Sequence, residues 1–283
     1  MPQQRATRTW FRRAGVLALL AGLAVVLAPG RSLAQEAPPA VPSEEEPEVL
    51  TSGPVNEAFA APVVVEDQGG VIAPSAPPEP VEEQPTSERP VGGQYAWIPG
   101  YWSWGQQRQA WVWVSGCWRA VPPGQSWVPV YWTHVSSGWE WVAGFWTPAG
   151  TQELEYLSTP PPAFEVQATS AAPGDDYTWV PGCYYWRSDR WVPRHGYWLR
   201  QVDGWCWTPS YLLRTPRGYV FCGGHWDYSL HRRGVLYAPV YMSRGIWSRR
   251  GFRLALSINI GLDDWDNDLF VCPGSSHYYF GDY

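Results

Sequence analysis

Residues 97–102 read Trp-Ile-Pro-Gly-Tyr-Trp, and this phrase decides the fold because it is repeated along the chain. Further copies begin at Trp113, Trp127, Trp141 and Trp179, and weaker ones begin at Trp191, Trp207 and Tyr219. Of the 21 tryptophans in the chain, 20 lie at or beyond residue 97. A phrase that recurs at such short intervals indicates one small supersecondary unit that is copied several times.

Aromatic residues stand two apart on both sides of the first Pro-Gly pair, as Tyr95 and Trp97 before it and Trp102 and Trp104 after it. A period of two is typical of β-strands, and Pro-Gly favours a turn. We therefore expect Trp97 and Trp102 to face each other across a hairpin that closes through a four-residue loop or a bulge. The sequence predicts an all-β fold, an array of about eight short antiparallel hairpins with one hairpin per phrase.

The phrases fall into two blocks, residues 93–148 and 177–243, and the Pro-rich stretch 149–176 between them is predicted to be a flexible spacer. Residues 244–283 form a C-terminal β segment, in which apolar and polar residues alternate from Phe252 to Ile260. Because aliphatic residues are sparse and each indole buries about 200 Å², we expect most tryptophans to form the core.

The N-terminus has the pattern of a secretory signal over residues 1–34. Its arginines precede a 15-residue apolar run, Ala14–Ala28, and Ser32-Leu33-Ala34 supplies small residues for cleavage before Gln35. The run is shorter than the roughly 20 residues of a membrane span, so export is expected, with an uncleaved anchor as the alternative. The mature chain is expected to have no transmembrane span.

Residues 35–92 hold twelve acidic residues against Arg89 alone and are rich in Pro and Glu. This composition predicts a disordered, extended linker. Residues 93–283 carry 14 arginines and 14 acidic residues. A neutral repeat region offers no basic patch, which argues against nucleic acid as a partner.

These phrases resemble the WXXGXW (also written YXWGXW) tryptophan-rich repeat family of exported bacterial proteins. The resemblance covers about residues 93–148 well and 177–226 more loosely, with Ser115, Val130 and Ala143 replacing turn residues of the phrase. It implies a location in the periplasm, in the cell envelope or outside the cell. It implies no established activity and no catalytic or binding residues.

The five cysteines form no Cys-x-x-Cys pair, which argues against a zinc site or a thioredoxin-like site. Export permits disulfides, so two bridges among Cys117, Cys183, Cys206 and Cys222 are one interpretation, and unpaired buried thiols are the other. With Cys272 the number is odd, so at least one thiol remains outside any internal bridge.

Chemistry of other kinds has little support in the sequence. The histidines are isolated, and Cys222 and His225 stand too close together along the chain for an activated pair, so we expect no enzyme and no cofactor. Asp264, Asp266 and Asp268 are a weak candidate for a calcium loop, since glycine is missing at its sixth position and no glutamate closes it. A solvated acidic turn is the alternative.

Two functional hypotheses remain. In the first, the array is a structural or protein-interaction module of the cell envelope, without catalytic activity. In the second, exposed rings stack on cell-wall glycan or another polysaccharide, with Tyr101, Tyr131 and Tyr197 as the candidate platforms.

Overall fold

The computed structural model describes seven stretches of the chain: residues 46–60, 70–85, 89–161, 167–256, 258–260, 269–271 and 278–281. All of them belong to one compact unit, Glu44–Tyr283. Their regular structure is almost wholly β-strand, and the helical elements are the short turn η1 (Leu230–Arg232) and the one-turn helix α1 (Arg244–Trp247). The all-β prediction is confirmed.

The basic unit of the fold is a long hairpin with a break in the middle of each arm. In hairpin 1, β5 (Tyr95–Ile98) pairs with β8 (Cys117–Ala120), and β6 (Tyr101–Gly105) pairs with β7 (Ala110–Val114). From the pair Ile98–Cys117 to the pair Tyr101–Val114 each arm advances by three residues, so both ladders share one register. The four strands are therefore two arms, interrupted at Pro99-Gly100 and at Ser115-Gly116.

The same construction occurs three more times. Hairpin 2 consists of β9 (Gln125–Val128), β10 (Tyr131–Val135), β11 (Gly138–Val142) and β12 (Phe145–Pro148). Hairpin 3 consists of β13 (Tyr177–Val180), β14 (Cys183–Arg187), β15 (Arg190–Arg194) and β16 (Tyr197–Arg200). Hairpin 4 consists of β17 (Trp205–Thr208), β18 (Tyr211–Thr215), β19 (Gly218–Cys222) and β20 (His225–Tyr228).

The prediction of about eight hairpins, one per phrase, was wrong, because each hairpin is longer than one phrase. Two phrases make one hairpin, and Trp97 and Trp102 follow each other on one arm, facing Trp118 and Trp113 on the other. Pro-Gly is suited to a type II turn, whose twist does not match a tight hairpin. The chain instead reverses at sites such as Ser188-Asp189, where both residues have positive φ, as a two-residue type I′ turn requires.

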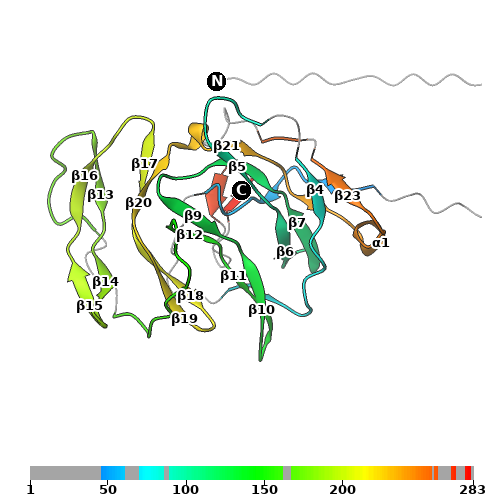
Figure 1. Ribbon diagram of the computed structural model, residues 1–283, viewed down its shortest axis with the longest axis horizontal. Coiled ribbons are helices and arrows are strands. Elements are labelled where there is room, and N and C mark those ends of the chain that lie inside the picture. The colour runs from blue at the N-terminus through cyan, green and yellow to red at the C-terminus, as the bar shows by residue number, and fades with distance from the viewer. Residues whose placement is uncertain are drawn as a thin grey trace, which may run out of the picture. The chain divides into compact units, whose positions relative to one another are not determined.

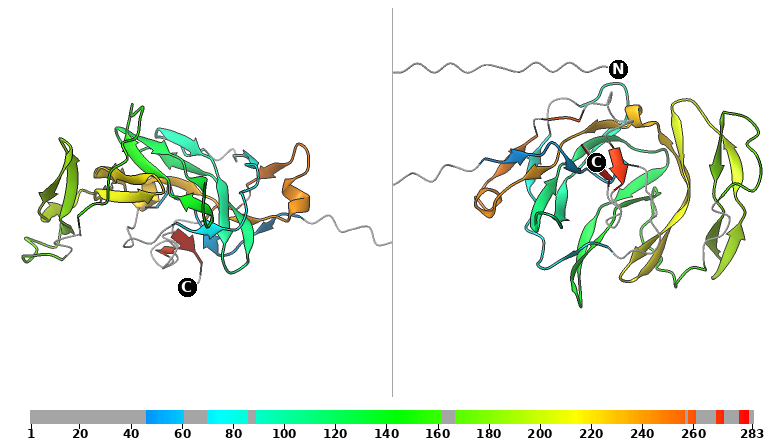
Figure 2. Two further views of the ribbon diagram at one scale, coloured as in Figure 1. Left: turned by 90° about the horizontal axis from the view of Figure 1, so that it is seen from below. Right: turned by 180° about the vertical axis from the view of Figure 1, so that it is seen from behind.

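The hairpins lie side by side in the order 1, 2, 4, 3 (Figures 1 and 2). Hairpins 1 and 2 meet where the rings of Trp111 and Trp132 are 5.0 Å apart. Hairpins 2 and 4 share an apolar cluster that includes Phe145 and Val220. Hairpin 3 contacts hairpin 4 through Tyr185, whose ring lies 5.2 Å from that of Phe221. The fourth hairpin is thus inserted between the second and the third.

Short strands from outside the repeats complete the sheets around hairpin 1 and hairpin 2. Beside hairpin 1, β21 (Gly234–Leu236) pairs with β8, β22 (Val240–Tyr241) pairs with β7, and β1 (Glu48–Val49) pairs with β22. In hairpin 2, β3 (Ile72–Ala73) pairs with β11. The remaining pairs join β2 (Gly53–Pro54) to β25 (Tyr278–Phe280), β24 (Leu269–Val271) to β25, and β4 (Glu82–Gln84) to β23 (Arg253–Ala255), the last in parallel.

The interpretation of residues 35–92 as a disordered linker does not hold for 46–60 and 70–85. Val55 and Phe59 are each 1% exposed, and Ala73 is fully buried. These apolar residues are too few to form a core of their own, but they complete a core that the hairpins supply. The composition of the whole segment hid them because Pro and Glu dominate the rest.

The core is largely aromatic, as the tryptophan content predicts. Trp102, Trp104, Trp113, Trp141 and Trp146 are buried, and several other indoles are half-buried. In the C-terminal segment the expected alternation is present at Leu254 and Leu256, which are buried on either side of exposed Ala255, and it ends at Ile258, which is 52% exposed. Within residues 149–176, predicted to be a spacer, Leu157 is buried and forms a β-bridge with Tyr219 of hairpin 4.

Candidate functional site

Each hairpin has a pair of facing indoles beside its central break. The ring centroids are 5.0 to 5.4 Å apart, and the planes are inclined: three pairs have the edge-to-face geometry that aromatic pairs favour, and the pair in hairpin 2 is tilted at 58°. The four pairs are Trp97–Trp118, Trp127–Trp146, Trp179–Trp198 and Trp207–Trp226. In each hairpin, the tryptophan that begins the phrase on the first arm therefore packs against the tryptophan that ends the phrase on the second arm.

The glycine of the second phrase lies directly against the first tryptophan of the same hairpin. A β-carbon added to this glycine would come within 3.0 Å of Cζ2 of the indole in all four copies. The pairs are Gly116 with Trp97, Gly144 with Trp127, Gly196 with Trp179, and Gly224 with Trp207. The spacing of Trp and Gly in the phrase is thus explained by contact between the two arms.

A carboxylate occupies the break of hairpin 1. Glu83, on β4, accepts hydrogen bonds from the backbone N–H of Gly100 at 2.8 Å, the backbone N–H of Gly116 at 2.7 Å and Nε1 of Trp113 at 2.8 Å. Burial raises the pKa of Glu83, and these hydrogen bonds oppose the rise. Sequence reasoning missed this residue because nothing local distinguishes it from the other acidic residues of 35–92.

A second buried charge cluster joins hairpins 1 and 4 to the N-terminal segment. Asp227 accepts a hydrogen bond from Arg119 and forms an ion pair with Arg233, and all three side chains are buried. Nε of Arg119 donates to the carbonyl of Ala58 at 2.7 Å, and Nη1 of Arg233 donates to the carbonyl of Phe59 at 2.6 Å. The guanidinium groups have protein partners throughout, so this cluster has a structural role.

A cleft with a volume of about 500 Å³ separates hairpins 3 and 4. Its aromatic lining consists of Trp179, Trp205, Trp207 and Trp226. Polar side chains of Thr178, Arg200, Gln201, Asp203, Ser229 and His231 also line it. Such a combination can stack against a flat or ring-shaped group and bond to its hydroxyls.

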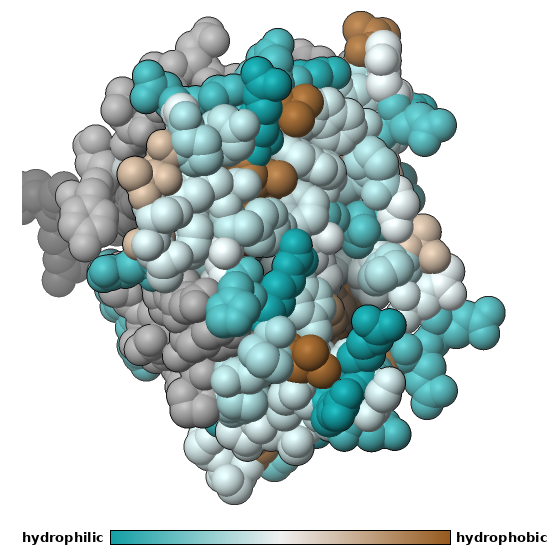
Figure 3. Space-filling view, turned by 90° about the vertical axis from the view of Figure 1, so that its left-hand side faces the viewer, coloured by the Kyte–Doolittle hydropathy of each residue, from teal (hydrophilic) through white to brown (hydrophobic). Residues whose placement is uncertain are grey.

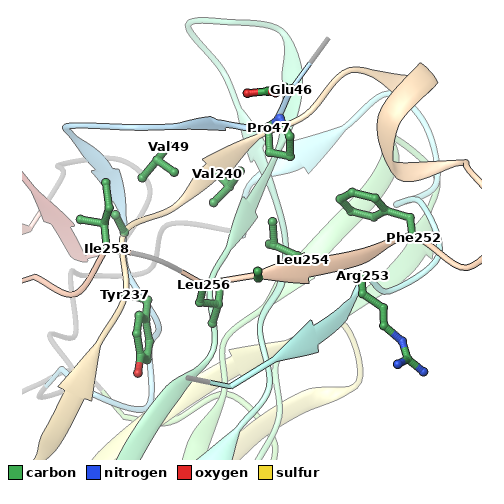
Figure 4. A pocket seen from close by; sticks show the side chains of 12 residues that line it. Glu46, Pro47, Val49, Tyr237, Val240, Phe252, Arg253, Leu254, Leu256 and Ile258 are labelled. Atoms are coloured by element: carbon green, nitrogen blue, oxygen red, sulfur yellow. The ribbon is translucent and has the colours of Figure 1, made fainter. Parts of the chain in front are cut away.

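A second hollow, with a volume of about 390 Å³, lies between β1, β22 and β23 (Figure 4). Its lining is mainly apolar and includes Val49, Val240, Phe252, Leu254 and Leu256. The side chain of Arg253 points away from these residues. This hollow lacks the convergent polar groups that the cleft between hairpins 3 and 4 has.

The structure does not bring the three candidate tyrosine platforms together. The hydroxyl of Tyr101 donates to the carbonyl of Val55 at 3.4 Å, and burial raises its pKa well above the ordinary value. Tyr131 is 37% exposed on hairpin 2, and Tyr197 lies on hairpin 3 under the guanidinium of Arg194, 4.5 Å from its ring centre. The aromatic cleft was not predicted, since its walls come from two hairpins whose adjacency the sequence does not reveal.

The four described cysteines, Cys117, Cys183, Cys206 and Cys222, are free thiols, so the interpretation with two bridges among them does not hold. Cys117 and Cys183 lie in hairpins that are not neighbours, and Cys206 and Cys222 face Asp227 and Tyr211 across their ladders. Burial raises the pKa of Cys117 and Cys222 to about 12. The alternative interpretation, unpaired thiols, holds for these four, although Cys206 is exposed.

The calcium candidates Asp264, Asp266 and Asp268, and also Cys272, lie outside the described residues. Within the described part of the chain, no three His, Cys, Asp or Glu side chains are grouped so that they could hold a metal ion. No helix in that part is long and apolar enough to cross a membrane.

Comparison with known proteins agrees with the geometry of the repeats. The family model of the WXXGXW repeat (2 copies) matches residues 95–119, 174–198 and 217–233. These matches cover nearly all of hairpins 1 and 3 and the second arm of hairpin 4. No curated protein and no solved structure matches the chain. The chain therefore contains WXXGXW repeats, detected in three ranges between residues 95 and 233.

Proposed function

We propose that the repeat array is an exported structural or protein-interaction module of the cell envelope. The observation that carries the proposal is the side-by-side packing of like hairpins, which ends at hairpin 3. Hairpins 2 and 4 contact hairpins on two sides, whereas the described contacts of hairpin 3 with another hairpin are those with hairpin 4. The signal pattern of residues 1–34 supports export.

Hairpin 3 is suited to contact another protein. Its aromatic side chains are half-buried, among them Tyr184, Trp186, Trp191 and Trp198. The corresponding side of the molecule is mixed in polarity, with isolated hydrophobic residues among pale and hydrophilic ones (Figure 3). Protein interfaces have this kind of surface, with enriched aromatic residues and an ordinary overall polarity.

Site-specific photo-crosslinking in cells would test this role. Trp191 of hairpin 3 and Trp111 of hairpin 1 occupy the same repeat position, but Trp111 packs on Trp132. With p-benzoylphenylalanine at either position, we expect adducts with an envelope protein from position 191 and not from position 111. A chain found in the cytoplasm, or equal results at both positions, would contradict the proposal.

Glycan binding is the second candidate, and the cleft between hairpins 3 and 4 is the observation in its favour. Four indoles line it together with hydroxyl, amide and charged groups. Co-sedimentation with the insoluble cell-wall fraction, with tryptophan emission recorded, would test it. Trp226→Leu should abolish retention, and Trp118→Leu, at the same position of hairpin 1, should not. If the unaltered chain is not retained, the glycan hypothesis fails.

A further inference from the structure

We propose that Gly182 and Gly196, at the central break of hairpin 3, form a second carboxylate-binding site of the kind that holds Glu83 in hairpin 1. The proposal goes beyond the envelope role, because it names the chemical group that a WXXGXW hairpin takes and does not depend on where the chain is located.

Hairpin 1 shows how such a site is built. Because the ladder is interrupted, the N–H groups of Gly100 and Gly116 are directed at one point, where both carboxylate oxygens of Glu83 lie. Two backbone donors that converge on an anion form strong, charge-assisted hydrogen bonds. Neither donor depends on a charged side chain, so the site is a property of the broken hairpin itself.

Both positions must be glycine for the carboxylate to enter. A β-carbon on Gly100 would lie 2.7 Å from Oε1 of Glu83, and one on Gly116 would lie 2.6 Å from Oε2. Any side chain at either position would therefore displace the carboxylate from its donors.

This requirement divides the four hairpins into two classes. Hairpins 2 and 4 keep the second glycine but have Val130 and Ser210 where hairpin 1 has Gly100. Hairpin 3 has glycine at both positions, Gly182 and Gly196, and Pro181 precedes the first as Pro99 does in hairpin 1. By this criterion hairpin 3 is the second hairpin that can take a carboxylate.

The geometry of hairpin 3 matches that of hairpin 1 around the break. Its two ladders also share one register, from Val180–Tyr197 to Cys183–Arg194. Gly196 lies against the indole of Trp179 as Gly116 lies against Trp97. One difference is that Pro193 stands where hairpin 1 has Trp113, so the indole N–H that also bonds Glu83 has no counterpart in hairpin 3.

The ligand is a carboxylate on an extended acidic segment, as Glu83 is on β4. It can belong to an acidic residue of this chain or to a separate molecule. The chemistry is the same in both cases, and the experiment distinguishes the two sources.

The test uses the full chain labelled with [15N]glycine, whose amide resonances are followed by NMR as the pH is lowered from 8 to 4. Amide protons that bond to a carboxylate shift when it is protonated. Gly100 and Gly116 are the positive control, and Glu83→Gln should abolish their titration. Gly144 and Gly224 are matched negative controls, because their hairpins have Val130 and Ser210 at the first position.

We expect Gly182 and Gly196 to titrate together. If they do so without additions, the carboxylate is the chain's own. If they shift only after sodium acetate or a peptide of residues 79–85 is added, the site takes an external carboxylate. Gly182→Val, which copies hairpin 2, should remove the response of Gly196 while Gly100 and Gly116 still titrate. No response of Gly182 and Gly196 under any of these conditions would overturn the proposal.

Discussion

The indole of Trp97 covers Gly116 so closely that a β-carbon on the glycine would come within 3.0 Å of Cζ2 of the ring. The same contact recurs between the second-phrase glycine and the first-phrase tryptophan of hairpins 2, 3 and 4. The repeated phrase therefore encodes a contact between two arms, and neither phrase can build the hairpin alone.

Gly116→Ala should destabilise the chain, because the new methyl group must displace both the Trp97 ring and the Glu83 carboxylate. Overpacking of this kind costs about 1–3 kcal/mol. Urea unfolding, followed by tryptophan emission, measures the loss. Gly245→Ala is the control, since the nearest atom to its added β-carbon is Oγ of Ser243 at 3.7 Å. Equal midpoints for the two variants would refute the explanation of the glycine.

Glu83 should make stability depend on pH. Burial raises its pKa above the ordinary value of 4.5 in the folded chain, so the folded chain holds the proton at a pH where the unfolded chain has lost it. The free energy of unfolding should therefore fall as the pH rises through the range just above 4.5. Urea unfolding at a series of pH values measures the slope. Glu83→Gln should flatten it, and Glu82→Gln, a change in the adjacent exposed carboxylate, should not.

The strands could be predicted from the sequence, but their partners could not. The period-two aromatics around Trp97 identify strands because alternation is a local property of the chain. Trp102 and Trp118 are chemically equivalent as partners for Trp97, so local chemistry does not decide between a turn at Pro99-Gly100 and a longer hairpin. Long-range packing decides it.

The candidate sites depend on contacts that are more distant still. Glu83 is one of twelve acidic residues in 35–92, and only the position of β4 beside hairpin 1 gives it a role. The order 1, 2, 4, 3 depends on contacts between hairpins made by residues such as Phe145 and Phe221, and the sequence around them carries no signal of which hairpins are adjacent. The cleft between hairpins 3 and 4 follows from that order.

Asp227→Ala should be among the most damaging single changes. It would leave the guanidinium groups of Arg119 and Arg233 buried without their carboxylate partner. Removing one partner of a buried ion pair costs about 3–5 kcal/mol. Asp176→Ala, which breaks the exposed pair with Arg200, is the matched control and should leave the unfolding midpoint unchanged. If both variants unfold at the same urea concentration, the buried cluster does not stabilise the fold.

The thiols should differ sharply in reactivity in the folded chain. Thiolates are the reactive form, and burial raises the pKa of Cys117 and Cys222 to about 12, so both are protonated and shielded at neutral pH. Cys206 is exposed. N-ethylmaleimide at pH 7, followed by peptide mass spectrometry, should modify Cys206 rapidly and leave Cys117 and Cys222 unmodified until urea is added. Rapid native labelling of Cys117 would mean that the core of hairpin 1 opens, and resistance of Cys206 to labelling even in urea without reductant would mean that this thiol is in a disulfide.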